Sequence, residues 1–197
     1  MSKEFITGEH VYLRPVERSD LGGRYREWIN DPEVVNFLAT GAYPQTDDEL
    51  LRYYESNINS RSQVLFAIVE KESDIHIGNA RIYGIDWLNR KAHRGIMIGE
   101  KSCWSKGYGK EVINLLSMYA FETLNLRKLS STTVGNNVGI IRVNEVCGYR
   151  QEGVLREEFY RDGRYYDVVY WGFLKSDYLA RKNAGDMGGA SSSRAQD

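Results

Sequence analysis

The stretch that decides the fold is Ala92-His93-Arg94-Gly95-Ile96-Met97-Ile98-Gly99, with the turn Gly107-Tyr108-Gly109 that follows it after a short loop. The first segment predicts a buried strand. The residues after the turn predict a long helix from Gly109 to Leu124, because apolar residues recur there at helical spacing. The first N–H groups of a helix have no acceptor within the helix, and the helix dipole favours negative charge. A strand that leads through glycines into a helix is therefore suited to bind a phosphorylated ligand.

The residues before this stretch predict one strand, two helices and two more strands. The first helix ends at Asp31-Pro32, because the residue before a proline avoids the helical region of backbone conformation. The second begins with Thr46 and Glu49, which have the spacing of a capping box. The expected elements are a strand at His10–Val16, a helix capped by Ser19 or Asp20, a helix after Thr46, and strands at Val64–Val69 and Ile75–Ile85, the last with a bulge near Gly78.

The residues after it predict two strands that flank a helix, and then a final strand. The expected elements are a strand at Leu129–Val134, a helix at Val138–Cys147 that ends at Gly148, and strands at Val154–Phe159 and Tyr165–Leu174 joined by a hairpin turn at Asp162-Gly163. The order is then β-α-α-β-β-β-α-β-α-β-β. This order predicts an α/β fold with a mixed sheet and helices on both of its faces.

Length and composition predict one globular domain over residues 1–182 and a disordered tail over residues 183–197, where Gly, Ala and Ser dominate. The net charge of −1 offers no basic surface for nucleic acid or for an anionic membrane. The N-terminus lacks the apolar segment of a signal peptide, and no apolar run is long enough to cross a membrane. Cys103 and Cys147 have neither metal-ligand spacing nor the pattern of a disulfide framework. We therefore expect a cytoplasmic protein with no metal site.

The glycine-rich turn does not match the two common nucleotide-binding motifs. A P-loop requires a glycine five positions before Gly109 and a serine or threonine after Lys110, but Trp104 and Glu111 stand there. A dinucleotide-binding fingerprint requires a third glycine where Val112 stands. A different phosphate-binding family is therefore indicated.

The segment Trp104-Ser105-Lys106-Gly107-Tyr108-Gly109 resembles the pyrophosphate loop of the GNAT superfamily of acyl-CoA-dependent N-acetyltransferases, usually written Arg/Gln-x-x-Gly-x-Gly/Ala. Tryptophan in the first place is typical of the branch that includes the ribosomal-protein N-terminal acetyltransferases RimJ and RimL. Segments at 28–34, 137–149 and 152–167 resemble the same branch, in the same order. The resemblance implies a central, mixed and mostly antiparallel sheet of about seven strands.

The resemblance implies a site for acetyl-CoA. The backbone of Met97, Ile98 and Gly99 is expected to pair with the pantetheine amides as an added strand would. The N–H groups of the turn are expected to hold the pyrophosphate, with nearby lysines adding positive charge, while an asparagine after the next strand binds the pantetheine arm. The expected coenzyme residues are Met97, Ile98, Gly99, Trp104, Ser105, Lys106, Gly107, Tyr108, Gly109, Lys110, Asn137 and Arg142.

Acetyl transfer to an amine requires a base, a donor for the oxyanion and a means of accepting the departing thiolate. We expect His93 to be the base, because an imidazole is neutral near physiological pH, with Asp86 and Glu100 as alternatives. The backbone N–H of Ile98 is the expected oxyanion donor. Asn144 stands where many members of the family carry a tyrosine that protonates the thiolate, and its amide can only hydrogen-bond the sulfur.

The family places the loop between the first two helices and the final hairpin around the amine acceptor. Acidic residues there would attract an ammonium group, whereas arginines would hold a phosphate or a carboxylate. A protein N-terminus, a small-molecule amine and an amino sugar on a nucleotide carrier all remain open as acceptors. A non-catalytic acyl-CoA-binding regulatory module is the alternative function, and a homodimer through the final strands is compatible with the family. The residues expected to contact the acceptor are Trp28, Asn30, Phe37, Arg81, Asp86, Arg156, Glu158 and Tyr160.

Overall fold

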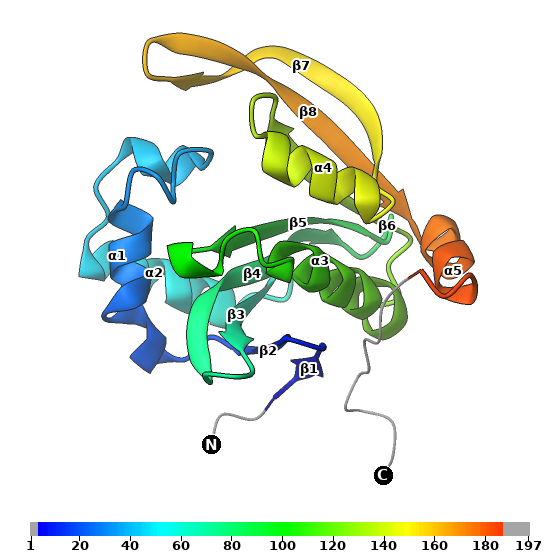
Figure 1. Ribbon diagram of the computed structural model, residues 1–197, viewed down its shortest axis with the longest axis horizontal. Coiled ribbons are helices and arrows are strands. Elements are labelled where there is room, and N and C mark those ends of the chain that lie inside the picture. The colour runs from blue at the N-terminus through cyan, green and yellow to red at the C-terminus, as the bar shows by residue number, and fades with distance from the viewer. Residues whose placement is uncertain (1–3, 187–197) are drawn as a thin grey trace.

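The computed structural model describes residues 4–186, which are organised around one eight-stranded sheet (Figure 1). The strands are β1 (Ile6–Thr7), β2 (Val11–Pro15), β3 (Val64–Glu70), β4 (Ile75–Asp86), β5 (Lys91–Ile98), β6 (Lys128–Val134), β7 (Arg150–Arg161) and β8 (Arg164–Leu174), in the spatial order β1-β2-β3-β4-β5-β6-β8-β7. The helices are α1 (Arg24–Asn30), α2 (Asp47–Ile58), α3 (Tyr108–Met118), α4 (Val138–Val146) and α5 (Lys175–Asn183). Among the strands of residues 4–186, only β5 and β6 pair in parallel, so the expected mixed, mostly antiparallel fold is confirmed.

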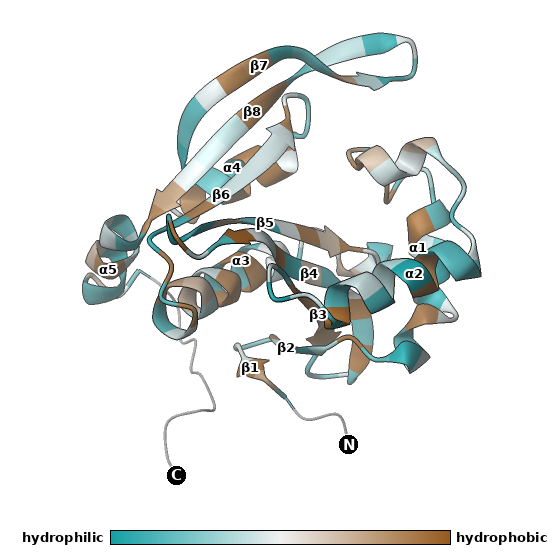
Figure 2. Cartoon of the chain, turned by 180° about the vertical axis from the view of Figure 1, so that it is seen from behind, coloured by the Kyte–Doolittle hydropathy of each residue, from teal (hydrophilic) through white to brown (hydrophobic). Residues whose placement is uncertain are grey.

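Helices cover both faces of the sheet. On one face, α3 buries Val112, Ile113 and Leu116 in the main apolar core against the central strands. On the other face, α1 and α2 form a smaller cluster around Trp28 and Leu50. Figure 2 shows the apolar residues of α3 and of the strands that it covers in brown. This division leaves the two faces of β5 in different surroundings.

Four details differ from the sequence-based expectations. Strand β1 and helix α5 were not expected, and Asn183, assigned to the tail, ends α5. The first helix is divided, since a 3-10 turn at Arg18–Leu21 precedes α1 and Gly23 adopts a φ of 63° between them. The long helix changes at Tyr119–Thr123 into a π-helical turn. The part of the expected tail beyond Asp186 lies outside the described residues.

Two local predictions are confirmed. Thr46 and Glu49 form a capping box at the start of α2. The strand register of β4 shifts next to Gly78, where a bulge was expected. Any larger residue than glycine would be impossible there without a backbone shift, because an added Cβ would lie 2.1 Å from the carbonyl oxygen of Met97. The glycine therefore allows the backbone of β4 to lie close to the end of β5.

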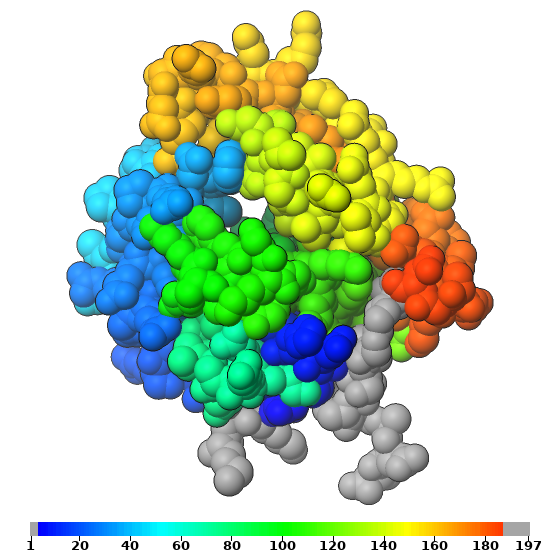
Figure 3. Space-filling model, viewed as in Figure 1, coloured from blue at the N-terminus to red at the C-terminus, as the bar shows by residue number. Residues whose placement is uncertain are grey.

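The strands β5 and β6 diverge after a short paired segment. They pair only from Lys91 to His93 on β5 and from Lys128 to Ser130 on β6. Beyond these residues, β5 continues to Ile98 with its edge toward β6 unpaired. Figure 3 shows an opening in the surface between α4, the segment before α3 and the loop that follows α1. The chain thus leaves a strand edge accessible beside the N-terminus of a helix. Within residues 4–186, no helix has both the length and the apolar character needed to span a bilayer.

Candidate active site

The free edge of β5 presents backbone polar groups at Ile98 and, by strand alternation, at Ile96. The N–H of Gly99 donates to the carbonyl of Ile77 at 2.9 Å, so the carbonyl of Ile98 points away from β4. The indole N–H of Trp104 donates to that carbonyl at 2.8 Å. In a regular strand the N–H of a residue lies on the same edge as its carbonyl, so the Ile98 N–H also faces the free edge. Gly99 was expected to pair with the coenzyme, but its N–H is already bonded to β4.

The turn before α3 forms a concave set of N–H donors. Ser105 and Gly107 adopt positive φ values of 61° and 88°, which alternate with ordinary conformations as in an anion-binding nest. Among the described residues, the N–H groups from Ser105 to Gly109 have no acceptor. A Cβ added to Gly107 would meet nothing within 4 Å, so the turn faces open space. Lys110 was expected to belong to this set, but its N–H already donates to the carbonyl of Gly107 at 3.0 Å.

Side chains around the turn hold it in place and add positive charge. The Tyr108 hydroxyl donates to Glu70 Oε1 at 2.6 Å, and this bond raises the pKa of Tyr108 to about 12. Lys106 Nζ lies 3.8 Å from the same oxygen, so part of its charge is already balanced. Lys110 and Arg142 are exposed, which leaves them available to an anion.

Asn137 begins helix α4 on the far side of the opening. Its side-chain oxygen accepts from the N–H of Ile140 at 3.3 Å and so caps the helix. The amide nitrogen of Asn137 is left for other contacts. The structure therefore places the expected coenzyme residues around one opening, formed by the end of β5, the turn before α3 and the start of α4.

His93 lies on β5 at the last residue that pairs with β6. Its ring stacks on Tyr83 at a centroid distance of 5.5 Å and meets the edge of Tyr170 at 6.5 Å. Burial lowers the pKa of His93 below its ordinary value, and the charges of Lys91 and Lys128 lower it further. No hydrogen-bond partner within residues 4–186 occupies either ring nitrogen. A half-buried, neutral imidazole beside the diverging strands is suited to accept a proton.

The two alternative bases are occupied elsewhere. Asp86 accepts from the backbone N–H of Asn89 at 2.8 Å and from its side chain at 2.7 Å, and these bonds lower the pKa of the Asp86 carboxyl. Glu100 forms an ion pair with Arg24 at 2.6 Å and accepts from Ser102 at 3.0 Å. These contacts favour His93 over both carboxylates.

Asn144 does not have the surroundings of a group that contacts the coenzyme sulfur. It is completely buried, accepts a hydrogen bond from Arg94 on β5 and donates to Thr133 Oγ1 on β6 at 3.2 Å. The side chain thus links the two strands where their backbones no longer pair. We correct the expected contact with sulfur to a structural role, because both ends of the amide are already bonded within the core.

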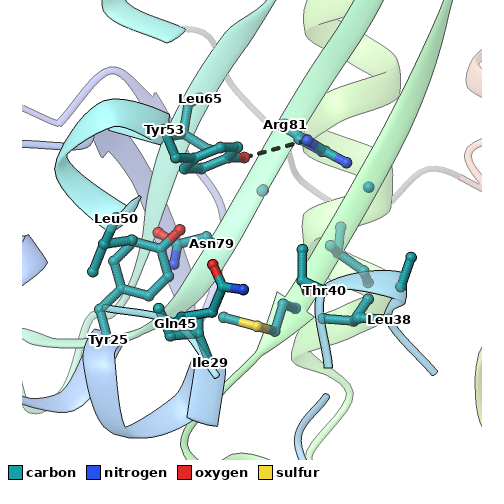
Figure 4. A pocket seen from close by; sticks show the side chains of 15 residues that line it. Tyr25, Ile29, Leu38, Thr40, Gln45, Leu50, Tyr53, Leu65, Asn79 and Arg81 are labelled. Atoms are coloured by element: carbon teal, nitrogen blue, oxygen red, sulfur yellow. Dashed lines mark hydrogen bonds between the residues drawn. The ribbon is translucent and has the colours of Figure 1, made fainter. Parts of the chain in front are cut away.

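A cavity of about 260 Å³ lies on the face of β4 and β5 that carries α1 and α2. Figure 4 shows the 15 side chains that line it, including Tyr53, whose hydroxyl accepts from Arg81 at 3.3 Å. Its lining residues are Tyr25, Ile29, Leu38, Ala39, Thr40, Gln45, Leu50, Tyr53, Leu65, Asn79, Ala80, Arg81, Gly95, Ile96 and Met97. The cavity reaches the end of β5 from the face opposite α3. A second substrate bound there would approach the free strand edge from the other side of the sheet.

Of the residues expected to contact the acceptor, Arg81 alone lines this cavity. Trp28 is buried against His76, with ring centroids 5.1 Å apart, and Asn30 instead holds the backbone of Gln45 at 2.9 and 3.0 Å. Phe37 is half-buried outside the cavity, and Asp86 is the last residue of β4 and does not line it. The hairpin residues Arg156, Glu158 and Tyr160 are exposed and do not line it.

Sequence reasoning did not identify Asn79, Gln45 and Tyr53 as site residues. Asn79 had one detectable signal: a polar residue at a buried position of a strand, next to the predicted bulge. The others are surface residues of a loop and a helix, and only the packing of those elements brings them to the cavity.

The fold and the site define an acetyltransferase of the GNAT class. Residues 10–150 match the family described as Acetyltransferase (GNAT) domain, which is well over half of the chain. The chain belongs to this family. In the part of the chain that the structure describes, no cluster of His, Cys, Asp and Glu is arranged to hold a metal ion.

Individual relatives agree with this assignment. The chain is 31% identical over 170 residues to spermidine N(1)-acetyltransferase of Vibrio cholerae, covering 86% of this chain and 95% of that protein. It is 30% identical over 179 residues to an uncharacterized N-acetyltransferase, p20, of Bacillus licheniformis, and the match covers 89% of this chain and 98% of that protein. A crystal structure of the Vibrio cholerae spermidine N-acetyltransferase in complex with CoA and spermine superposes with a TM-score of 0.80 at 30% identity, over 86% and 98% of the two chains. The protein is accordingly an N-acetyltransferase that uses acetyl-CoA.

Proposed function

We propose that acetyl-CoA binds along the free edge of β5, with its diphosphate on the turn before α3, and that a small-molecule primary amine binds in the cavity on the opposite face. The observation that carries this proposal is the row of N–H groups from Ser105 to Gly109 without acceptors, next to an unpaired strand edge. Backbone N–H groups at a helix N-terminus are a preferred site for phosphate. The cavity supports a small-molecule acceptor, because its walls are formed by α1, the loop after α1, α2 and the strands β3 to β5.

In this arrangement each of these groups has one role in the reaction. His93 accepts a proton from the amine through water while the new C–N bond forms, and the Ile98 N–H, further along β5, stabilises the oxyanion of the tetrahedral intermediate. The intermediate expels the coenzyme thiolate, to which the His93 imidazolium can return the proton. The thiol pKa, about 8.5 by analogy with cysteine, makes a separate acid dispensable. Each turnover consumes one amine and one thioester and yields one amide and one thiol.

Thiol release tests this function directly. Wild-type protein is mixed with acetyl-CoA and a panel of primary amines, and free thiol is followed with a chromogenic disulfide. We expect amine-dependent release and a product whose mass is increased by one acetyl group. Calorimetry that detects no binding of acetyl-CoA to the folded protein would contradict the proposal.

Arg161 is expected to support the cavity in which the amine acceptor is proposed to bind. From the end of β7 it donates to the carbonyls of Gly41, Leu38 and Val35 at 3.2, 2.8 and 3.4 Å, and thereby holds the loop that forms one wall of the cavity. In Arg161→Met we expect the KM for the amine to rise about three- to tenfold with little change in kcat, because a mobile wall weakens binding without touching the reacting atoms.

Steady-state kinetics at saturating acetyl-CoA measure this effect. Arg150→Met is the matched control, since Arg150 lies at the other end of β7 and pairs with Asp177 at 3.2 Å. An unchanged KM in Arg161→Met would show that the hairpin does not organise the acceptor site.

We also propose a branch of the family, a location in the cell and an oligomeric state. The tryptophan that begins the phosphate-binding turn supports placement in the RimJ/RimL-like branch. Cys103 and Cys147 are both unpaired and buried thiols, which supports a cytoplasmic location. Strand β7 lies at the edge of the sheet and exposes Val154 and Leu155, which supports a homodimer through the final hairpin.

A further inference from the structure

We propose that the amine acceptor carries a carboxylate or phosphate group, which Arg81 and Asn79 bind in the cavity between α1, α2 and the end of β5. This inference rests on the proposed N-acetyl transfer at the same site and names the class of acceptor. The evidence, within residues 4–186, is a half-buried cation without a counter-ion, a buried amide donor without an acceptor, and a cavity lining without acidic residues.

Arg81 is positioned to bind an anion inside the cavity. It lies on β4 opposite Gly95, and a Cβ added to that glycine would lie 3.4 Å from Arg81 Nε, so the arginine side chain passes directly over β5. Its guanidinium stacks on Tyr83 at 4.2 Å and donates to the hydroxyl of Tyr53. No Asp or Glu of the described chain forms an ion pair with it. By contrast, the buried guanidinium of Arg14 is paired with Asp20 at 2.6 Å.

Asn79 adds a neutral donor to the same cavity. His76 Nε2 lies 2.8 Å from the carbonyl of Gly78, which can only accept, so this nitrogen carries a proton. The same nitrogen is 3.2 Å from Asn79 Oδ1, so the oxygen of the amide faces His76. The amide nitrogen is buried and has no hydrogen-bond partner among the described residues, while the residue itself is only 6% exposed. A buried donor of this kind gains most from an acceptor supplied by a ligand.

The rest of the lining fixes the sign of the preferred charge. The 15 residues around the cavity include one arginine and no aspartate or glutamate. Several are apolar or aromatic, so the cavity also accommodates the carbon skeleton of a small ligand. A polyamine would bring a second ammonium group close to Arg81 with no carboxylate to balance it, and like charges in a partly buried site repel. An amine that carries an anion satisfies both Arg81 and Asn79.

Paired amines that differ in one group test the inference. The first pair is 4-aminobutyrate and 1,4-diaminobutane, which replaces a carboxylate by an ammonium group. The second pair is O-phosphoethanolamine and ethanolamine, which tests phosphate in place of carboxylate, and spermidine is included as a polyamine. We expect kcat/KM to be at least about tenfold higher for the anionic member of one pair, equivalent to about 1.4 kcal/mol. The pair that shows the preference identifies the anion.

Two variants connect the preference to these residues. Arg81→Gln removes the charge, and Asn79→Asp keeps an oxygen toward His76 while it replaces the free amide donor by a carboxylate oxygen. Both are expected to reduce the anionic preference to about twofold or less, mostly through KM. Arg52→Gln is the control, because Arg52 is an exposed arginine of α2 that lies outside the cavity lining and donates to the carbonyl of Asp48 at 3.2 Å. Asn79→Asp keeps the test decisive if Arg81→Gln does not fold.

Each outcome separates the inference from the function on which it rests. A wild-type preference for 1,4-diaminobutane or spermidine, or a preference that survives in both variants, overturns the inference and leaves N-acetyl transfer intact. Acetyl-CoA binding without acetylation of either anionic amine also overturns it. Failure of acetyl-CoA to bind contradicts the proposed function itself.

Discussion

Replacing His93 with alanine lowers kcat by about 10²–10⁴-fold, the range expected for loss of a general base. Within residues 4–186, the ring contacts of the His93 side chain are with Tyr83 and Tyr170 and not with the phosphate-binding turn, so the Kd for acetyl-CoA should stay within about twofold of wild type. Single-turnover thiol release with acetyl-CoA already bound measures the chemical step, and calorimetry measures the coenzyme affinity.

The pH dependence distinguishes a base from a merely structural histidine. The imidazole acts as a base only when it is neutral, and burial places the pKa of His93 below its ordinary value of 6.5. The wild-type rate should therefore rise with pH through that lowered pKa and become independent of this group above it. The acidic limb of the profile should disappear in His93→Ala, together with most of the activity.

His10→Ala is the control for this experiment. His10 is an exposed histidine at the turn between β1 and β2, and its substitution should leave both kcat and the pH profile unchanged. If His93→Ala keeps wild-type turnover, the assignment of the base is wrong, and Asp86 or Glu100 would be examined next.

Gly107→Val is expected to raise the Kd for acetyl-CoA by at least about tenfold. Gly107 has a φ of 88°, which a β-branched residue adopts only at a cost of about 1–3 kcal/mol. The turn should relax toward an ordinary conformation, and its N–H groups would then no longer converge on one anion. A steric clash does not cause the expected loss of affinity, because no atom of the described residues lies within 4 Å of a Cβ added to Gly107.

A second glycine separates this local effect from general destabilisation. Gly185 follows α5 and has a φ of 80°, and no atom of the described residues lies within 4 Å of a Cβ added there. Gly185→Val should impose a comparable backbone strain and leave the Kd for acetyl-CoA unchanged. Equal affinities in Gly107→Val and wild type would show that the turn does not bind the diphosphate. Titration calorimetry measures the Kd of each variant for CoA and for pantetheine, which lacks the diphosphate.

The coenzyme side of the site could be predicted from sequence because its determinants are local. A strand, a glycine turn and a helix follow one another along the chain, so the residue types alone place the N–H donors at a helix start. The finer details needed the structure. The bonds of the Gly99 and Lys110 N–H groups depend on strand β4 and on the geometry of the first helical turn.

The acceptor cavity could not be predicted in the same way, because it joins residues far apart in sequence. Tyr25, Gln45 and Tyr53 reach it from α1, the loop before α2 and α2 itself, and only tertiary packing brings them to Asn79 on β4. The hairpin residues that the sequence predicts to contact the acceptor do not line this cavity. The hairpin is instead joined to one wall of the cavity by Arg161, which donates to carbonyls of the loop after α1.

Asn144 shows why a position in a motif does not determine a role. It occupies the place of a catalytic tyrosine in the resemblance, yet here its amide joins Arg94 and Thr133 inside the core. A buried guanidinium needs such an acceptor, because an unpartnered charge in the interior is costly.

A crystal structure of the protein with bound CoA would locate the coenzyme relative to β5 and α3. We expect diphosphate oxygens within hydrogen-bonding distance of the N–H groups of Ser105 to Gly109, and a pantetheine arm along the free edge of β5 with its sulfur near the Ile98 N–H. A coenzyme bound elsewhere, with these N–H groups facing solvent and the edge of β5 empty, would contradict this expectation.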